Sequence, residues 1–269
     1  MLRRNRDTAG PRHVLVTGVA SGLGLALATE FLAKGDRVTL TDLHDEAPET
    51  VTALGGDWSY RRLDVTSEDD WAAVAAETDR LDILVSNAGI AVGGRVTETS
   101  VATWQQALDI NVLGAVRGVR AMVPKLGRGG RVVLTASLAG LVHAPSMATY
   151  NATKAATVAL GETLDAELRA DGITTSVICP QFFRSGLADS LTGDDAAADA
   201  FARILLGRTW LTAPTIARRA VKGIEARRVV ITPDAVAVFS WYSKRFTRIP
   251  YLLVVRLIGR VTAARMRRR

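Results

Sequence analysis

Thr17-Gly18-Val19-Ala20-Ser21-Gly22-Leu23-Gly24 is the stretch of sequence that decides the fold. It joins an apolar β-branched run, His13–Val16, to a segment of helical period, Leu23–Ala33, which Lys34-Gly35 ends. Glycines let the backbone approach a bound group, and a helix start offers unpaired N–H groups and the positive end of its dipole. The spacing is Gly-x3-Gly-x-Gly rather than Gly-x-Gly-x-x-Gly. The stretch therefore predicts a diphosphate-binding turn, with a plain glycine-rich β–α turn as the alternative.

The alternation of strand and helix continues along the chain to residue 232. Short β-branched runs predict seven strands, at His13–Val16, Arg37–Thr41, Trp58–Leu63, Leu81–Val85, Arg131–Thr135, Thr174–Ile178 and Val229–Thr232. Helical periods fit between them at Leu23–Ala33, Ser67–Ala76, Val101–Lys125 and Ala148–Ala170. This order is typical of βαβ units, so we expect an α/β fold with one doubly wound parallel sheet.

Charge divides the 269 residues into a body and two basic ends. The formal charge is +7, but residues 1–12 hold four Arg and one Asp, and residues 235–269 hold nine Lys or Arg and no acid. The rest has 21 basic and 26 acidic residues, a net charge of about −5, which argues against a nucleic-acid-binding body. We expect a basic arm at 1–11, one catalytic domain at 12–234 and a basic amphipathic extension at 235–269.

Cysteine usage and hydropathy indicate the compartment. Cys179 is the single cysteine, which excludes an internal disulfide and fits a reducing environment. No apolar run of eighteen residues and no signal peptide are found, so a cytoplasmic location is expected. Three His and one Cys share no ligand spacing, so no metal site is expected.

Polar residues follow three of the predicted strands, at the edge of a parallel sheet where ligands bind. Asp42 ends the second strand, about twenty residues after the glycine-rich stretch, where a carboxylate can accept both ribose hydroxyls and repel a 2′-phosphate. This favours NAD over NADP, with a turn or helix-capping role as the alternative for Asp42. Asp64-Val65 follows the third strand and Ser86-Asn87-Ala88-Gly89 the fourth.

A second group of residues indicates acid–base chemistry. Ser137 follows the fifth strand, and Tyr150 and Lys154 lie four residues apart on the next helix, so both face the same side. Lowering a phenol pKa from about 10 to about 7 needs roughly 4 kcal/mol, which Lys154 and an oxidised nicotinamide would supply. Tyr150 would then be the general acid or base, and Ser137 would donate a hydrogen bond to the substrate oxygen. Asn111 interrupts an apolar helical pattern, either as a functional or as a solvated position.

The ordered set of motifs resembles the short-chain dehydrogenase/reductase family over residues 12–232. The resemblance implies a Rossmann-type domain with seven parallel strands, hydride transfer with a nicotinamide, and a Ser137–Tyr150–Lys154 centre that Asn111 extends through a water relay. Lys154 would also hold the nicotinamide ribose. The implied cofactor-binding residues are Gly18, Ser21, Gly22, Leu23, Gly24, Asp42, Asp64, Val65, Asn87, Ala88, Gly89, Tyr150, Lys154, Pro180, Phe183 and Ser185.

The segment after the sixth strand departs from the family pattern. Pro180-Gln181 stands where the family usually has Pro-Gly, which restricts the backbone and places a side chain near the mouth of the site. Ser185 stands where the family often has the Thr that binds the nicotinamide carboxamide.

Two segments are expected to form the substrate wall. They are Leu138–His143 and a lid at about 182–211, and both are rich in apolar residues. The candidate substrate-binding residues are Ser137, Leu141, His143, Tyr150, Phe182 and Leu187. We expect a lipophilic secondary alcohol or ketone, steroid-like, retinoid-like or fatty, although these residues could instead only pack the lid on the body.

Small residues on the long helix, Ala155, Ala156, Ala159 and Gly161, would let another helix approach closely. The family resemblance implies a homodimer or homotetramer through this helix and the one at Val101–Lys125. Burial of the small residues against the sheet is the competing explanation.

The extension at 235–269 mixes aromatic, aliphatic and basic residues at helical spacing, so a basic amphipathic helix is expected from Phe239 onward. It could dock on its own body or on a partner subunit, or lie on an anionic membrane; nucleic acid is the least favoured partner. For the whole chain, the expected NAD-dependent oxidoreductase has two alternatives. One is a nucleotide-sensing or scaffold protein of the same fold, and the other is a membrane-surface protein governed by its tail.

Overall fold

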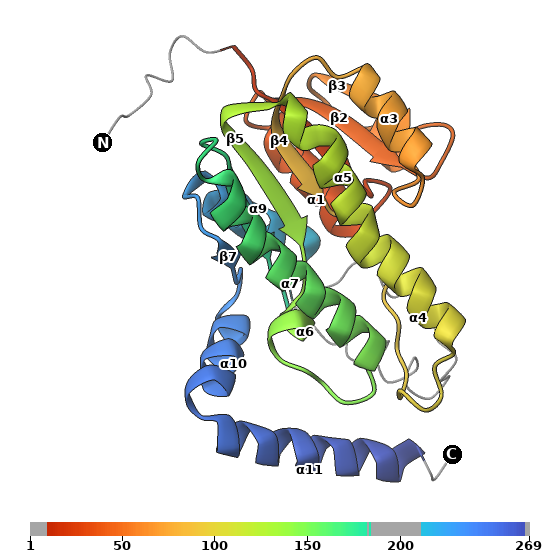
Figure 1. The fold of residues 1–269 in the computed structure, drawn as a ribbon, viewed down its shortest axis with the longest axis vertical. Helices are drawn as coiled ribbons and strands as arrows, with labels where there is room; N and C mark the ends of the chain where they lie inside the picture. The colour runs from red at the N-terminus through yellow and green to blue at the C-terminus, as the bar shows by residue number, and fades with distance from the viewer. Residues whose placement is uncertain (1–9, 182, 184–210, 267–269) are drawn as a thin grey trace.

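A computed structural model describes residues 10–181, 183 and 211–266 (Figure 1). Its sheet has seven parallel strands in the order β3-β2-β1-β4-β5-β6-β7, which confirms the expected architecture. The strands are β1 His13–Thr17, β2 Arg37–Asp42, β3 Trp58–Arg62, β4 Leu81–Ser86, β5 Leu126–Thr135, β6 Thr174–Ile178 and β7 Val230–Ile231. The predicted lid residues Phe182, Ser185 and Leu187 lie outside the described residues.

Helices cover both faces of the sheet. They are α1 Gly22–Leu32, α2 Glu49–Thr52, α3 Glu68–Ala76, α4 Val101–Leu108, α5 Gly114–Met122, α6 Leu138–Leu141, α7 Ala148–Leu168, α9 Ala213–Glu225, α10 Ala235–Phe246 and α11 Arg248–Met266. A π-helical turn, Asp109–Leu113, joins α4 to α5, and a 3-10 turn, Val123–Lys125, follows α5. The prediction of one uninterrupted helix at Val101–Lys125 is therefore wrong, because a π-helical turn and a 3-10 turn interrupt it. The short helices α2 and α6 and the helix α9 were not predicted.

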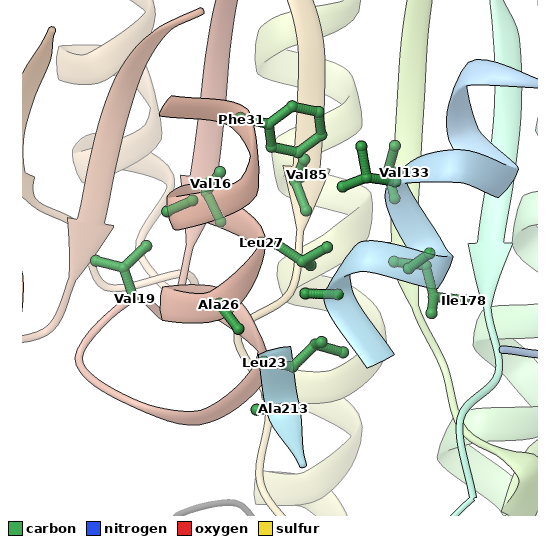
Figure 2. Packing of buried hydrophobic residues seen from close by; sticks show 14 of the residues in the cluster. Val16, Val19, Leu23, Ala26, Leu27, Phe31, Val85, Val133, Ile178 and Ala213 are labelled. Atoms are coloured by element: carbon green, nitrogen blue, oxygen red, sulfur yellow. The ribbon is translucent and has the colours of Figure 1, made fainter. Parts of the chain in front are cut away.

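The side chains of β1 point alternately to the two faces of the sheet, and each face has its own buried cluster. Val14 and Val16 belong to a buried cluster with Leu27 and Phe31 of α1, whereas Leu15 belongs to another with Trp71. Figure 2 shows the first cluster, in which α1 packs over the strands next to α9. Because successive side chains of a strand point to opposite faces, one apolar run supplies both cores.

The long helix α7 packs on the sheet through one of its small residues. A Cβ on Gly161 would overlap Cγ2 of Val177 in β6, and Gly161 is buried. Burial against the sheet, the competing explanation, therefore accounts for this glycine. Ala159 on the same helix is exposed.

The C-terminal extension forms two helices rather than one. The first begins at Ala235, where the Asp234 carboxylate accepts a hydrogen bond from the Ala237 N–H at 2.8 Å, and ends at Phe246. The second, α11, crosses the end of the molecule below α6 and α7 (Figure 1). None of the helices within the described ranges is long and apolar enough to span a bilayer.

Candidate active site

The glycine-rich stretch forms a tight turn between β1 and α1. Gly18 has a φ of +72°, and a Cβ there would lie 2.8 Å from Cα of Ala88. A Cβ on Gly24 would overlap the Gly18 carbonyl oxygen, so this glycine lets α1 pack against the turn. Only glycine allows both the positive φ and this approach without strain.

The start of α1 has no side-chain cap, unlike the starts of α3, α4 and α10. Ser67, Ser100 and Asp234 each cap their own helix by accepting a backbone N–H through the side chain. Ser21 at the N-cap of α1 makes no such bond, and Ser21, Gly22 and Leu23 line a cavity. The positive end of this helix dipole therefore faces the cavity, which suits a diphosphate.

Asp42 lies at the end of β2 and is hydrogen-bonded to the glycine-rich turn between β1 and α1. Its carboxylate accepts hydrogen bonds from the N–H groups of Ala20 and Leu43, both at 2.8 Å, and lies 3.1 Å from Nδ1 of His44. The residue also lines the cavity. Asp42 therefore has the turn role that was considered as an alternative. Its carboxylate nevertheless lies at the cavity wall.

Asn87 ties three strands together at the same edge. Its Nδ2 donates to the carbonyl oxygens of Thr17 at 3.0 Å and Gly18 at 3.2 Å, and its Oδ1 accepts from Oγ1 of Thr135. The hydroxyl of Thr17 in turn accepts the N–H groups of Asn87 and Ala88. Asn87 therefore holds the floor of the cavity in place as well as lining it.

The cavity has a volume of about 610 Å³, in the usual range for ligand sites. Of the predicted cofactor-binding residues, it is lined by Gly18, Ser21, Gly22, Leu23, Asp42, Asp64, Val65, Asn87, Ala88, Gly89, Tyr150, Lys154, Pro180 and Phe183. Gly24 is not among the lining residues because it is buried against the turn. The uncapped helix start, the glycines that a Cβ would crowd and the Asp42 carboxylate together fit a dinucleotide.

The three predicted chemical residues meet at the wall of this cavity. Ser137 follows β5 and caps α6, while Tyr150 and Lys154 come from the first turns of α7. The Ser137 hydroxyl lies close enough to the Tyr150 hydroxyl to lower the pKa of the phenol in part. Nζ of Lys154 lies 5.7 Å from the centre of the Tyr150 ring and donates to the Thr135 carbonyl oxygen at 3.0 Å.

Burial governs the acidity of this pair. Loss of hydration raises the pKa of Tyr150 to about 12, although the Ser137 hydrogen bond lowers it in part. Loss of hydration also lowers the pKa of Lys154 to about 8. Burial thus favours the neutral form of each group in the cavity without cofactor, and the acidic phenol expected beside an oxidised nicotinamide stays a prediction.

Asn111 lies in the π-helical turn and is buried, with 3% of its surface exposed. Its Oδ1 accepts from the Ile90 N–H at 2.9 Å, and its Nδ2 donates to the Ile90 carbonyl oxygen and to Oγ1 of Thr153. It lies behind Gly89, where a Cβ would come within 2.8 Å of Oδ1 and 3.3 Å of Nζ of Lys154. The solvated alternative for Asn111 is thus wrong.

Two predicted substrate-binding residues do not line the cavity. Leu141 is buried in a cluster with Ala136, Val158 and Cys179, because α6 turns it toward the core. His143 lies against the C-terminal helices, with its ring nitrogens 3.3 Å from Nζ of Lys244 and its N–H donating to the Tyr251 hydroxyl at 3.0 Å.

The substrate side contains residues that the sequence analysis missed. Gln106, Ile110 and Met147 line the cavity, as does Gln181, whose side chain was expected there. Met147 lies three residues before Tyr150, a spacing that places both near one side of a helix start and could have indicated it.

Comparison with known proteins identifies the family. The short chain dehydrogenase family model matches residues 12–196, and the chain belongs to this family of oxidoreductases. Cyclopentanol dehydrogenase of Comamonas sp. is 33% identical over 228 residues, covering 81% of this chain and 87% of that protein. The 2-(R)-hydroxypropyl-CoM dehydrogenase of Xanthobacter autotrophicus is 37% identical over 183 residues, covering 63% and 73%.

A solved structure supports the same assignment. A short chain dehydrogenase/reductase from Burkholderia phymatum in complex with NAD is 28% identical, has a TM-score of 0.80, and the match covers 88% of this chain and 93% of that one. The expected family, enzyme class and nicotinamide-binding Rossmann fold are thereby confirmed.

Proposed function

We propose that this enzyme transfers a hydride between NAD and a lipophilic secondary alcohol or ketone, with Tyr150 as the general acid or base. The observation that carries the proposal is the meeting of Ser137, Tyr150 and Lys154 at the wall of the cavity that begins at the glycine-rich turn. One continuous cavity thus joins the start of α1 to the phenol of Tyr150 beside Ser137.

The preference for NAD rests on charge at the end of β2. Asp42 lines the cavity with uncharged Ala20 and Leu43, whereas His44, which lies 3.1 Å from the carboxylate, does not line it. A carboxylate there accepts ribose hydroxyls and repels a 2′-phosphate. Lys154 would hold the nicotinamide ribose, and Asp64 and Val65 would lie against the adenine end.

Proton transfer is the work of the chain's own residues. A bound oxidised nicotinamide would supply the hydride acceptor and a positive charge beside Tyr150. Ser137 orients the substrate oxygen by hydrogen bonding, and the Tyr150 hydroxyl exchanges the proton with it. Because burial holds the pKa of Tyr150 near 12 in the cavity alone, the phenol is protonated and ready to act as an acid in ketone reduction. Alcohol oxidation requires a nearby positive charge to lower that pKa.

The lipophilic substrate class rests on the lining near Tyr150. Ile90, Ala91, Met147 and Phe183 contribute apolar surface, while Gln106 and Gln181 offer amides without charge. An apolar wall with few polar groups binds a hydrocarbon body and orients one oxygen. The name of the Comamonas relative, a cyclopentanol dehydrogenase, agrees with a cyclic secondary alcohol.

The test compares Tyr150→Phe with wild type on a panel of cyclic, steroid, retinoid and fatty alcohols, with NAD and NADP side by side. Loss of the proton-transfer group should reduce kcat by about 10²–10⁴-fold while NAD binding, measured by calorimetry, persists. Tyr242→Phe is the matched control, since that ring is 51% exposed on α10 and should leave turnover unchanged. Full activity of Tyr150→Phe would contradict the proposal. NAD binding without turnover of any alcohol or ketone would favour the scaffold alternative.

A further inference from the structure

The helices α10 and α11 expose an unusual amount of apolar surface. On α11, every fourth residue of one row is apolar and exposed: Ile249 by 74%, Leu253 by 58%, Leu257 by 61% and Val261 by 45%. On α10, Phe239, Tyr242 and Phe246 are 74%, 51% and 72% exposed. We call these side chains, together with Arg245, Arg248, Arg256 and Arg260, the tail surface. Exposed apolar side chains gathered in this number on two neighbouring helices mark an interaction surface.

The charge of the same segment is entirely positive. The neighbouring row of α11 contains Arg248, Arg256 and Arg260, all exposed, and α10 adds Arg245. No Asp or Glu occurs from residue 235 to residue 269. An apolar row beside a basic row on a helix is typical of helices that lie in a membrane interface.

The opposite side of α11 is held by the body of the enzyme. The Tyr251 hydroxyl accepts the His143 N–H at 3.0 Å, and the site of a Cβ on Gly259 lies 3.6 Å from Pro145. Nζ of Lys244 on α10 donates to the Leu141 carbonyl oxygen at 2.6 Å. Since the third row of α11, Tyr251, Val255 and Gly259, faces the body, the apolar row of Ile249, Leu253, Leu257 and Val261 is turned outward.

The charge and the apolar row of the tail surface together indicate which partner binds it. A symmetric contact between two copies would bring the basic rows together, and like charges at an interface are costly. A nucleic acid would satisfy the arginines but leave the aliphatic row exposed to water. An anionic bilayer satisfies both, because its head groups attract Arg and its acyl chains accept Leu and Val.

We propose that the tail surface docks this enzyme on the face of an anionic lipid bilayer, with α11 lying along the interface. The aromatic rings of α10 would lie at head-group depth, where Tyr and Trp are commonly found. Since α11 contacts the segment 143–145 that leads into Met147 and Tyr150, docking brings the substrate side of the molecule to the membrane (Figure 1). The proposal does not depend on the substrate class.

The experiment is flotation of the 269-residue chain with vesicles of phosphatidylcholine alone or with phosphatidylglycerol added. Wild type should float with the anionic vesicles and much less with the neutral ones. Leu253→Ser/Leu257→Ser and Arg256→Gln/Arg260→Gln should each weaken binding by about tenfold or more. High salt should release the wild type in part, because the attraction is electrostatic.

Matched controls change the same residue types elsewhere. Leu108→Ser/Leu113→Ser alters exposed leucines on α4 and the π-helical turn, and Arg37→Gln/Arg128→Gln alters exposed arginines at the opposite end of the sheet. Both should float like wild type. Circular dichroism and NAD binding establish that each variant is folded.

Three outcomes would overturn the proposal. Equal flotation of wild type and Leu253→Ser/Leu257→Ser would remove the apolar row from membrane binding. A stable dimer by light scattering that only the leucine variant dissociates, without vesicle binding, would assign the surface to a second copy. Tight binding to short duplex DNA, lost in the arginine variant and kept in the leucine variant, would assign it to nucleic acid.

Discussion

The two ends of the cavity are built by different means. At the nucleotide end, neighbouring strands hold each other through backbone groups and short side chains, as where Asp42 accepts the Ala20 N–H and Asn87 donates to Thr17 and Gly18. At the substrate end, the segment after α6 is held by Lys244 and Tyr251, about a hundred residues further along the chain. The strands of the sheet and their turns hold the nucleotide end, whereas α10 and α11 hold the substrate end.

This contrast teaches where changes are tolerated. Crowded glycines and fully bonded amides leave no room at the nucleotide end, because a misplaced backbone group loses both packing and hydrogen bonds. The contacts at the substrate end are few and partly exposed, so each contributes less. Substitutions in the two regions should therefore differ in the size of their effect and in the ligand whose binding they change.

Gly24→Ala should have the largest effect on stability. The new Cβ would overlap the Gly18 carbonyl oxygen and approach Nδ2 of Asn87, and neither can move without breaking the turn. We expect a loss of about 3 kcal/mol in the free energy of unfolding, measured in urea, and a large loss of NAD affinity. Gly55→Ala is the control, since nothing lies within 4 Å of its Cβ site. Equal midpoints for the two variants would contradict the crowding at the turn.

Lys154→Met should separate stability from catalysis. Burial lowers the pKa of Lys154 to about 8 from an ordinary value of 10.5, so the unfolded chain binds more protons between these values and stability rises with pH there. Removing the buried ammonium should stabilise the protein by about 1–2 kcal/mol at pH 7 and abolish turnover.

The pH dependence sharpens this prediction. The stability advantage of Lys154→Met over wild type should shrink between pH 8 and pH 10, below the range in which Tyr150 titrates. Lys34→Met, on an exposed lysine after α1, should show no such change. A variant less stable than wild type at pH 7 would mean that the bond to the Thr135 carbonyl oxygen outweighs the loss of hydration.

Lys244→Met should have the smallest effect, and only at the substrate end. Loss of the bond to the Leu141 carbonyl oxygen should raise KM for the alcohol by about two- to fivefold and leave the Kd for NAD unchanged. Arg245→Met, an exposed neighbour on the same helix, is the control. An equal change in NAD affinity would show that the two ends are not independent.

The same contrast explains what could be predicted from the sequence. Strands, the glycine-rich turn, Asp42 and the Tyr150–Lys154 pair are local patterns, since spacing alone sets which side of a strand or helix a residue faces. Leu141 and His143 were placed at the substrate wall because they follow Ser137 closely in sequence. Their side chains turn toward the core and the C-terminal helices, contacts that no local pattern encodes. The break at Thr247 between α10 and α11 was likewise hidden within one continuous helical period.

The π-helical turn at Asp109–Leu113 has a consequence for how this gene can vary in length. One extra residue in that turn allows the Asn111 amide to reach Ile90 while Gly114 and Gly118, further along, still meet Val65 and Trp71. Deleting one residue there would restore ordinary winding and leave both glycines facing their bulky partners, because five residues of a π-helix turn about as far as four of an α-helix. A one-residue deletion in this stretch should therefore cost the Asn111 contacts with Ile90 while the packing of α5 against Val65 and Trp71 survives.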